Sequence, residues 1–238
     1  MNKFTGKPAS PGIAVGSVIY IPGKEPEEKR SIAVPDAEIQ RYMGAVEQAI
    51  KELEELELHS AEPLGKGNAA LFSVHRMMLE DDEFREKVRT IIQDNRLCAE
   101  YAIDQAAANI SAIFSEMDDA YMKARAADVL DISDRLIRIL SGRQSSFVLS
   151  DAPAIYAAAD FFPSQVASFR QDSVLAIICA DGSQTSHAAI FARALRIPAV
   201  FEIGSDLADL ASHTVIVDGT TGILIADPDT ETITLYQS

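Results

Sequence analysis

The hydrophobic periodicity of this 238-residue chain changes twice along its length, and that change constrains the fold most. Residues 14–21 are short, β-branched and bracketed by Pro-Gly pairs, which is typical of a strand. From 33 to 143, apolar residues recur every three or four positions, which predicts helices. After residue 145, short apolar runs alternate with helix candidates, which indicates an α/β unit.

The middle segment is predicted to form four helices. The first begins near Asp36, a candidate N-cap, and buries one stripe of apolar residues. The second, over about 68–92, contains an acidic run where we expect a bend. The third and fourth cover about 99–117 and 118–140, and Gly142 suits the C-terminal cap of the last one.

The final segment is predicted to build a sheet that includes the first strand. Its strand candidates are 154–158, 174–178, 214–217 and 222–225, its helix candidates are 163–169 and 185–195, and further strands are expected between 218 and 236. A lone strand at 14–21 is not stable by itself, so we expect it to join this later sheet. The predicted domains are therefore 1–22 plus 145–238, a discontinuous α/β domain, and 33–143, an inserted four-helix bundle.

Charge and composition exclude several classes of function. The 36 acidic and 21 basic residues give a net charge of −15, which repels nucleic acids and anionic membranes but favours a basic protein partner. The sequence contains neither a secretory signal nor a stretch of about 18 apolar residues, so a cytoplasmic protein is expected. Cys98 and Cys179 lie in apolar surroundings and are predicted to be buried, without a disulfide or a metal.

The segment from Cys179 to Ala199 carries the candidate chemistry. It is predicted to run as strand, polar turn and helix, with Thr185 or Ser186 as the helix N-cap and His187 in the first turn. Backbone N–H groups and the helix dipole favour anions there and disfavour imidazolium, so His187 is predicted to be a neutral nucleophile that can hold a phosphoryl group. On spacing alone, a histidine that only satisfies local polar groups is the alternative.

Several segments resemble enzyme I of the phosphoenolpyruvate-dependent sugar phosphotransferase system. They are Thr185-Ser186-His187 with Ile197-Pro198-Ala199, the opening Ala9-Ser10-Pro11-Gly12, and the helical stretch that contains Arg125-Ala126-Ala127-Asp128. The resemblance implies an α/β phosphohistidine swivelling domain with an inserted all-α helical bundle. It also implies a transferase in which His187 takes phosphate from phosphoenolpyruvate and passes it to a histidine of HPr, which docks on the bundle.

The same resemblance implies the cofactors and partners. In that family the phosphoenolpyruvate and Mg2+ sites lie in a C-terminal barrel, so no cofactor is expected in this chain and Mg2+ is expected only with that absent domain. The expected partners are an HPr-like phosphocarrier and, for a truncated chain, its own C-terminal domain. Because dimerisation resides in the barrel of related enzymes, this chain is expected to be monomeric.

Two positions around His187 depart from the family pattern. The family reads Gly-Gly-Arg-Thr-Ser-His, whereas Gln184 stands here at the arginine position. Val166 replaces a family threonine that resembles an orienter of the histidine. A glutamine amide offers phosphate fewer donors and no charge, so a catalytically impaired paralogue that acts as a regulatory or binding module is the alternative function. The predicted catalytic residues are His187, Gln184, Thr185 and Ser186.

Three residues of the helical segment are predicted to contact the partner: His75, Glu83 and Arg125. The alternative for His75 is a packing role, and for Arg125 a solvated helix charge. Glu83 belongs to an acidic run that would steer a basic carrier or would simply be solvated. No histidines or cysteines have metal-ligand spacing, and a Ser-His hydrolase is disfavoured because the Gly-x-Ser-x-Gly elbow is absent.

Overall fold

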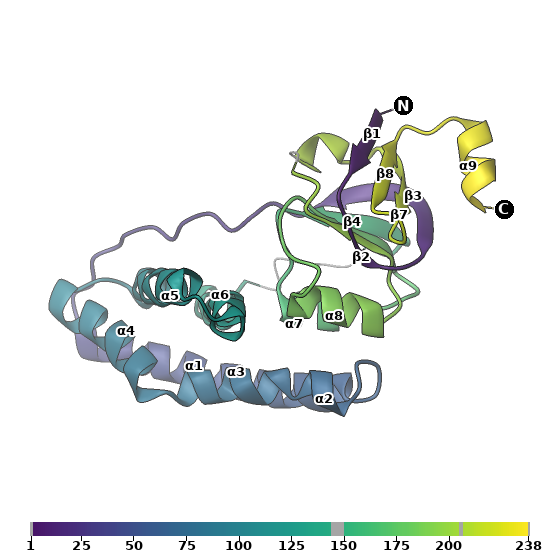
Figure 1. Ribbon diagram of the computed structural model, residues 1–238. Helices are drawn as coiled ribbons and strands as arrows, with labels where there is room; N and C mark the ends of the chain where they lie inside the picture. Colours follow the sequence, from purple (N-terminus) through teal and green to yellow (C-terminus); the bar gives the residue numbers. More distant parts are fainter. Residues whose placement is uncertain (1, 144–149, 205–206, 238) are drawn as a thin grey trace. The chain divides into compact units, whose positions relative to one another are not determined.

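A computed structural model describes residues 2–143, 150–204 and 207–237 of the chain (Figure 1). The chain divides into two compact units, one formed by Met1–Lys24 with Phe147–Ser238 and the other by Glu25–Ser146. The first unit is α/β and the second is helical, which confirms the predicted fold class. The predicted boundary at residue 145 lies outside the described residues.

One eight-stranded sheet forms the centre of the α/β unit. Its strands are β1 (Asn2–Thr5), β2 (Lys7–Ser10), β3 (Ile13–Tyr20), β4 (Ala154–Ala158), β5 (Val174–Cys179), β6 (Ala199–Phe201), β7 (Thr214–Asp218) and β8 (Ile223–Ala226). Their order across the sheet is β1-β8-β7-β3-β4-β5-β6-β2. β3 pairs in parallel with β4 and antiparallel with β7, which confirms that the first predicted strand joins the later sheet.

The two outer strands are neighbours in sequence, so the sheet has to curl. Only Gly6 separates β1 from β2, although they occupy opposite ends of the strand order. The N–H of Gly6 donates to the carbonyl of Gly222 at 2.9 Å. Glycine is also required at Gly219, where a Cβ would lie 2.0 Å from the carbonyl oxygen of Ser10. Backbone therefore packs directly on backbone where the edges of the sheet approach each other.

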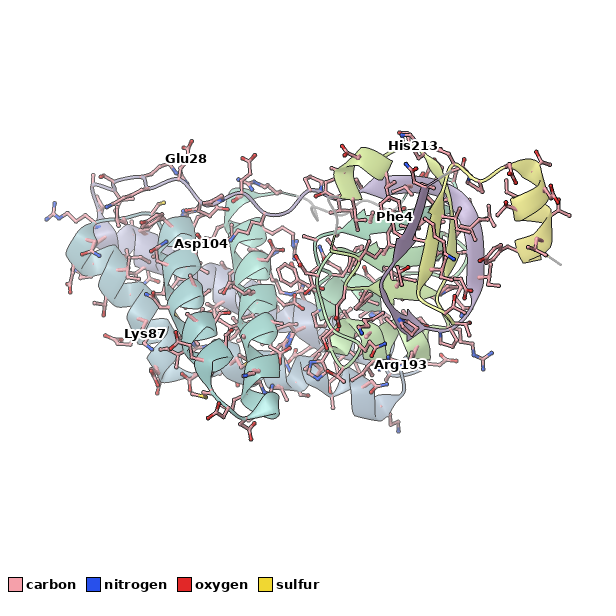
Figure 2. All side chains as sticks on the ribbon, turned by 45° about the horizontal axis from the view of Figure 1, so that its top comes forward. Phe4, Glu28, Lys87, Asp104, Arg193 and His213 are labelled. Carbon is pink, nitrogen blue, oxygen red and sulfur yellow. The ribbon has the colours of Figure 1, made fainter. Side chains whose placement is uncertain are left out.

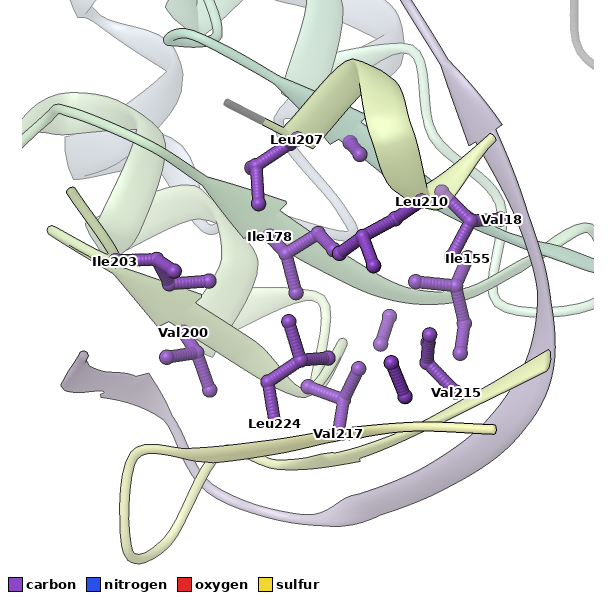
Figure 3. Close-up of a cluster of buried hydrophobic side chains, with 13 residues drawn as sticks. Val18, Ile155, Ile178, Val200, Ile203, Leu207, Leu210, Val215, Val217 and Leu224 are labelled. Carbon is purple, nitrogen blue, oxygen red and sulfur yellow. The ribbon is translucent and has the colours of Figure 1, made fainter. Parts of the chain in front are cut away.

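Apolar side chains from six strands fill the inside of the curled sheet. Figure 3 shows Val18, Ile155, Ile178, Val200, Val217 and Leu224 pointing toward a shared interior. Leu207 and Leu210, from a short 3-10 helix (Leu207–Leu210), join the same cluster.

Cys179 is fully buried and Cys98 is buried in the other unit, both as free thiols, which confirms their predicted packing role.

Three α-helices accompany the sheet in the described part of this unit. α7 (Pro163–Ala167) and α8 (His187–Ala194) lie beside one another on one side of it (Figure 1). α9 (Thr230–Gln237) occupies a segment where strands were predicted, and that prediction is wrong. The alternating threonines of 230–236 imitate a strand period, but Asp229 accepts a hydrogen bond from the N–H of Thr232 at 2.8 Å and starts a helix.

The helical unit contains six helices among the described residues, where four were predicted. They are α1 (Pro35–Ser60), α2 (Lys66–Ala69), α3 (Leu71–Glu80), α4 (Asp82–Asn95), α5 (Ala99–Glu116) and α6 (Ala120–Ser141). The expected bend at the acidic run is a break, because Asp81 ends α3 and its carboxylate accepts the N–H groups of Glu83 and Phe84 that open α4. Gly142 ends α6 with a φ of 61°, which confirms the predicted C-cap.

The start of α1 differs from the prediction. Val34 is the N-cap, Pro35 opens the helix, and Asp36 therefore lies in the first turn rather than at the cap. Proline suits that position, because its missing N–H would have no intrahelical partner there.

Among the described residues, no helix is both long enough and apolar enough to cross a bilayer.

One ion-pair network joins the first turn of α1 to the first turn of α5. The guanidinium of Arg41 donates to both oxygens of Glu100, at 3.0 and 2.7 Å, and to Glu38 at 2.7 Å. Glu38 also accepts the N–H of Ala99 at 2.7 Å, and Arg30 lies 3.4 Å from Glu100. Burial would raise the pKa values of Glu38 and Glu100, but the hydrogen bonds and charge of Arg41 lower both below the ordinary value.

Candidate functional site

The loop that carries His187 begins at the carboxyl end of β5. The neighbouring parallel strand β4 ends at the same edge, so Asp160 and Asp181, which each lie two residues beyond a strand, come close together. The N–H of Asp181 donates to the carbonyl of Ala159 at 2.8 Å and extends the pairing. Gly182 then turns the chain with a φ of 87°, and a Cβ there would lie 3.0 Å from the Asp160 carboxylate. The loop is therefore fitted closely to the sheet edge.

His187 is the first residue of α8. The hydroxyl of Ser186 accepts a hydrogen bond from the N–H of Ala189 at 3.2 Å, so Ser186 is the N-cap, one of the two residues predicted for it. The other, Thr185, has its hydroxyl 3.0 Å from that of Ser183. The side chains of Ala188 and Ala189 are buried against the unit, whereas His187 is half-buried and keeps contact with solvent.

The amide of Gln184 is bonded to the N-terminal strand. Its Nε2 donates to the carbonyl of Pro8 in β2 at 2.7 Å. Arg193, on the last turns of α8, donates from Nη1 to the carbonyl of Ala9 at 2.7 Å and to the carbonyl of Gln184 at 3.1 Å. The sequence analysis did not assign Arg193 to the site, because nothing in the local sequence indicates that β2 lies beside this loop.

Asp160, whose carboxylate lies close to Gly182 of the loop, has a raised pKa. Crowding of Asp160 by protein atoms is the main cause, and the charge of Asp181 adds to it, although the N–H of Phe161 donates to Asp160 at 2.8 Å and opposes the rise. The sequence analysis did not assign this residue either.

Val166, at the position where the resembled family has threonine, is fully buried in α7 and has no group that could bond to a histidine.

A second candidate surface lies on the helical unit. A groove of about 590 Å3 is lined mainly by apolar side chains of α3, α4, α5 and α6. Met77 and Ile113 in this lining are 67% and 51% exposed, so part of the apolar lining faces solvent. Glu83 and Arg125, both predicted partner-contact residues, line the same groove.

His75 does not reach this surface. Its side chain is fully buried, with Nε2 3.3 Å from the carboxylate of Asp128 and the ring packed edge-on against Phe72. The prediction that His75 contacts a partner is therefore wrong, and its packing alternative holds. The reason is the position of His75 on the face of α3 that also buries Phe72 and Leu79.

The described residues contain no group of three His, Cys, Asp or Glu side chains that could hold a metal ion. Asp160 and Asp181 are two carboxyl groups without a third ligand of that kind beside them.

Comparison with known proteins identifies the family. The family description "PEP-utilising enzyme, N-terminal" matches residues 5–125, about half of the chain, and "PEP-utilising enzyme, mobile domain" matches residues 150–222. This chain belongs to the PEP-utilising enzymes. Among curated members of the family, the phosphoenolpyruvate-protein phosphotransferase of Bacillus sp. (strain S) is 36% identical over 98% of this chain, and that of Bacillus subtilis (strain 168) is 34% identical over 100%.

Solved structures of PEP-utilising enzymes have the same fold. A solution structure of an enzyme I protein matches with a TM-score of 0.75 and 32% identity, covering 98% of this chain and 96% of that one. An N-terminal domain of a nitrogen-type enzyme I matches with a TM-score of 0.65 and 28% identity, covering 98% of both chains. The chain spans about two fifths of the length of the curated relatives named above, 41% and 42% respectively.

Proposed function

We propose that this chain is a phosphoryl carrier that accepts phosphate on His187 and passes it to a histidine of an HPr-like carrier protein. The single observation that carries the proposal is a half-buried imidazole on the first turn of a helix capped by Ser186, within a family of PEP-utilising enzymes. Helix N-termini favour anions, so a phosphoryl group at this position is stabilised by the nearby N–H groups and by the dipole.

The chemistry at His187 is a pair of phosphoryl transfers. A neutral ring nitrogen attacks the phosphorus of phosphoenolpyruvate, a nitrogen–phosphorus bond forms, and the ester oxygen–phosphorus bond breaks to release the enolate of pyruvate. A histidine of the carrier protein then attacks the same phosphorus, and His187 leaves as a neutral imidazole. Ser186 supports both steps by fixing the start of α8.

The donor and its metal are proposed to bind elsewhere in the whole protein. The curated relatives bear the name phosphoenolpyruvate-protein phosphotransferase and are more than twice as long as this chain. By the resemblance, phosphoenolpyruvate and Mg2+ occupy a C-terminal barrel domain, which would be a second partner of this chain. No Mg2+-dependent step is assigned to the residues described above.

The groove on the helical unit is proposed as the docking surface of the carrier. Its apolar lining would bury a matching apolar patch, while Glu83, which pairs with Lys87 at 2.8 Å, and Arg125, which pairs with Asp128 at 3.4 Å, would contact polar or charged groups of the carrier. The net charge of −15 favours encounter with a basic carrier at low salt. His75 lies beneath this surface and is not part of the proposed contact.

Incubation with phosphorylated HPr, followed by intact-mass measurement, tests the proposal. We expect one acid-labile, alkali-stable phosphoryl group on the wild type and none on His187→Ala, while both proteins bind HPr. Arg170→Ala serves as a control in the same unit, because this exposed arginine bonds to Asp172 and its loss keeps the imidazole and the Ser186 cap. A phosphoryl group retained on His187→Ala would refute the assignment. Binding of HPr without any transfer to the wild type would favour the regulatory or binding module.

A further inference from the structure

Two side chains connect the loop before His187 to the N-terminal strand β2. The Gln184 amide donates to the carbonyl of Pro8 at 2.7 Å. The guanidinium of Arg193, labelled in Figure 2, donates from Nη1 to the carbonyl of Ala9 at 2.7 Å and to the carbonyl of Gln184 at 3.1 Å. Because Nη1 carries two hydrogens, it can make both bonds at once.

The geometry of β2 makes its carbonyls available to these donors. The pairing of β2 with β6 shifts register between Pro8 and Ser10, and Ala9, which lies between them, has no paired residue in the register. Such a bulge turns backbone groups out of the ladder. The carbonyl of Ala9 can then accept a side-chain donor without loss of a strand hydrogen bond.

Arg193 therefore joins three elements, which are α8, β2 and the loop that precedes His187. Its own backbone belongs to α8, which His187 opens, and its guanidinium reaches both β2 and the loop residue three positions before His187. Guanidinium groups keep a fixed planar arrangement of donors and remain charged, so they hold two carbonyls in a defined geometry. Rotation or sliding of α8 relative to the loop would break at least one of these bonds.

We propose that Arg193 and Gln184 form a positioning clamp that fixes the direction in which His187 presents its imidazole. The clamp rests on the proposed phosphoryl-carrier function and adds a role for the N-terminal strand. It also changes the interpretation of Gln184, which the sequence analysis treated as a weak phosphate donor. In the clamp, the Gln184 amide binds Pro8 and acts on the phosphoryl group only through the loop.

Phosphoryl transfer from phosphorylated HPr, followed by rapid quenching over a series of HPr concentrations, tests the clamp. For Arg193→Ala we expect the maximal transfer rate to fall at least about tenfold, because small misplacements of reacting atoms are costly, with little change in the half-saturating HPr concentration. Arg193→Lys should recover part of the rate, since one ammonium can still reach a carbonyl. Gln184→Ala should slow transfer less, and the Arg193→Ala/Gln184→Ala pair should be non-additive.

Arg170→Ala is the matched control, since Arg170 is an exposed arginine of the same unit that bonds to Asp172 on the surface. It should transfer at the wild-type rate. Amide hydrogen exchange of residues 183–187 is measured on the same proteins and should be faster in Arg193→Ala than in the wild type and Arg170→Ala.

The outcomes separate the clamp from the function on which it rests. If the wild type takes no phosphoryl group, the proposed function fails, and the exchange data alone decide whether the clamp orders the loop. If the wild type is phosphorylated but Arg193→Ala matches its rate, or loses only affinity for HPr, the clamp is wrong. Unchanged exchange in Arg193→Ala would also overturn it. Circular dichroism verifies that each variant is folded.

Discussion

Burial separates the two histidines that the sequence suggested for function. His187 is half-buried at the start of α8, where it can meet another molecule. His75 is fully buried next to Asp128, which in turn lies 3.4 Å from Arg125 in the lining of the helical groove. Asp128 therefore connects a buried histidine to Arg125, whose side chain is 15% exposed, and we expect any contribution of His75 to partner binding to be indirect.

Substitution of His75 and Arg125 tests this difference. We expect His75→Leu to change the affinity for HPr by no more than about twofold, since truncated residues outside an interface rarely matter. Arg125→Gln should weaken binding by about tenfold, which corresponds to about 1.4 kcal/mol. Isothermal titration calorimetry measures both affinities, and circular dichroism confirms that the variants are folded. A large loss of affinity in His75→Leu alone would contradict the assignment.

The sequence predicted the local part of the His187 site and missed its long-range part. Ser186 as a cap and His187 in the first turn depend on neighbouring residues, so capping rules suffice to find them. The contact of Gln184 with Pro8 joins residues 176 positions apart, and that of Arg193 with Ala9 joins residues 184 apart. Such contacts depend on the closure of the sheet, which no local pattern indicates.

At the scale of elements, the Arg41 network makes the junction of α1 and α5 sensitive to acid. Hydrogen bonds and charge from Arg41 lower the pKa values of Glu38 and Glu100 in the folded state, despite the opposing effect of burial. A carboxyl group with a lowered folded pKa stabilises the fold above its unfolded pKa and loses that contribution as the pH falls through the folded value.

We therefore expect the free energy of unfolding to decrease as the pH falls below about 4.3, the ordinary pKa of glutamate. Glu100→Gln should cost about 1–3 kcal/mol at neutral pH, because it replaces one of the two charged partners of the Arg41 guanidinium with a neutral amide and leaves only Glu38 charged. The same variant should show a shallower loss of stability with acid. Urea titrations followed by far-ultraviolet circular dichroism at several pH values measure both effects. Equal acid sensitivity in the wild type and Glu100→Gln would show that this network is not responsible.

The closure of the sheet depends on glycines that permit contact between backbones. We expect Gly219→Ala to destabilise the α/β unit by more than about 3 kcal/mol, since its Cβ would lie 2.0 Å from the Ser10 carbonyl oxygen and 2.8 Å from the Ala199 nitrogen. Gly44→Ala is the matched control. Gly44 lies inside α1 with open space around it, so alanine should stabilise that helix by about 0.5–1 kcal/mol. Urea denaturation measures both, and a Gly219→Ala variant as stable as the wild type would contradict the close contact.

Sequence patterns predicted most of the long elements but only some of the short ones, such as the four-residue strand β8, which was predicted at 222–225. The strand prediction at 154–158 agrees with β4, and the predicted third helix agrees with α5 to within one residue. β1, β2 and β6 were missed because they have three or four residues each, too few to show a period. The break at Asp81 was predicted as a bend because the apolar pattern continues from α3 into α4.

At the scale of the whole molecule, the two units differ in how their chain segments are connected. The helical unit is one continuous segment, Glu25–Ser146, whereas the α/β unit takes residues from both ends of the chain. β3 lies within the sheet between β7 and β4, so the C-terminal segment by itself lacks an inner strand. The helical unit separates β3 from β4 in the sequence, although these two strands pair with each other in the sheet.

We expect a polypeptide of residues 25–146 to fold by itself and a polypeptide of residues 147–238 to remain unfolded. The second lacks β1, β2 and β3, and so exposes apolar strand surface of β4, β7 and β8. Dispersion of amide signals in proton–nitrogen correlation spectra distinguishes the two outcomes. Addition of a peptide covering residues 1–24 should restore dispersion to the second polypeptide, and folding without that peptide would contradict this account of the sheet.

Because Asn2 pairs with Ala226, the order of synthesis on the ribosome limits when β1 can join the sheet. The first strand to emerge cannot pair with β8 until Ala226 has been made. At about 5–20 residues per second, that interval is on the order of 10–45 seconds. All helices of the inserted unit have been made well before β8. Until then, β1, β2 and β3 expose unpaired strand edges that favour aggregation. Demand for chaperones in a living cell should therefore last until β8 has been made.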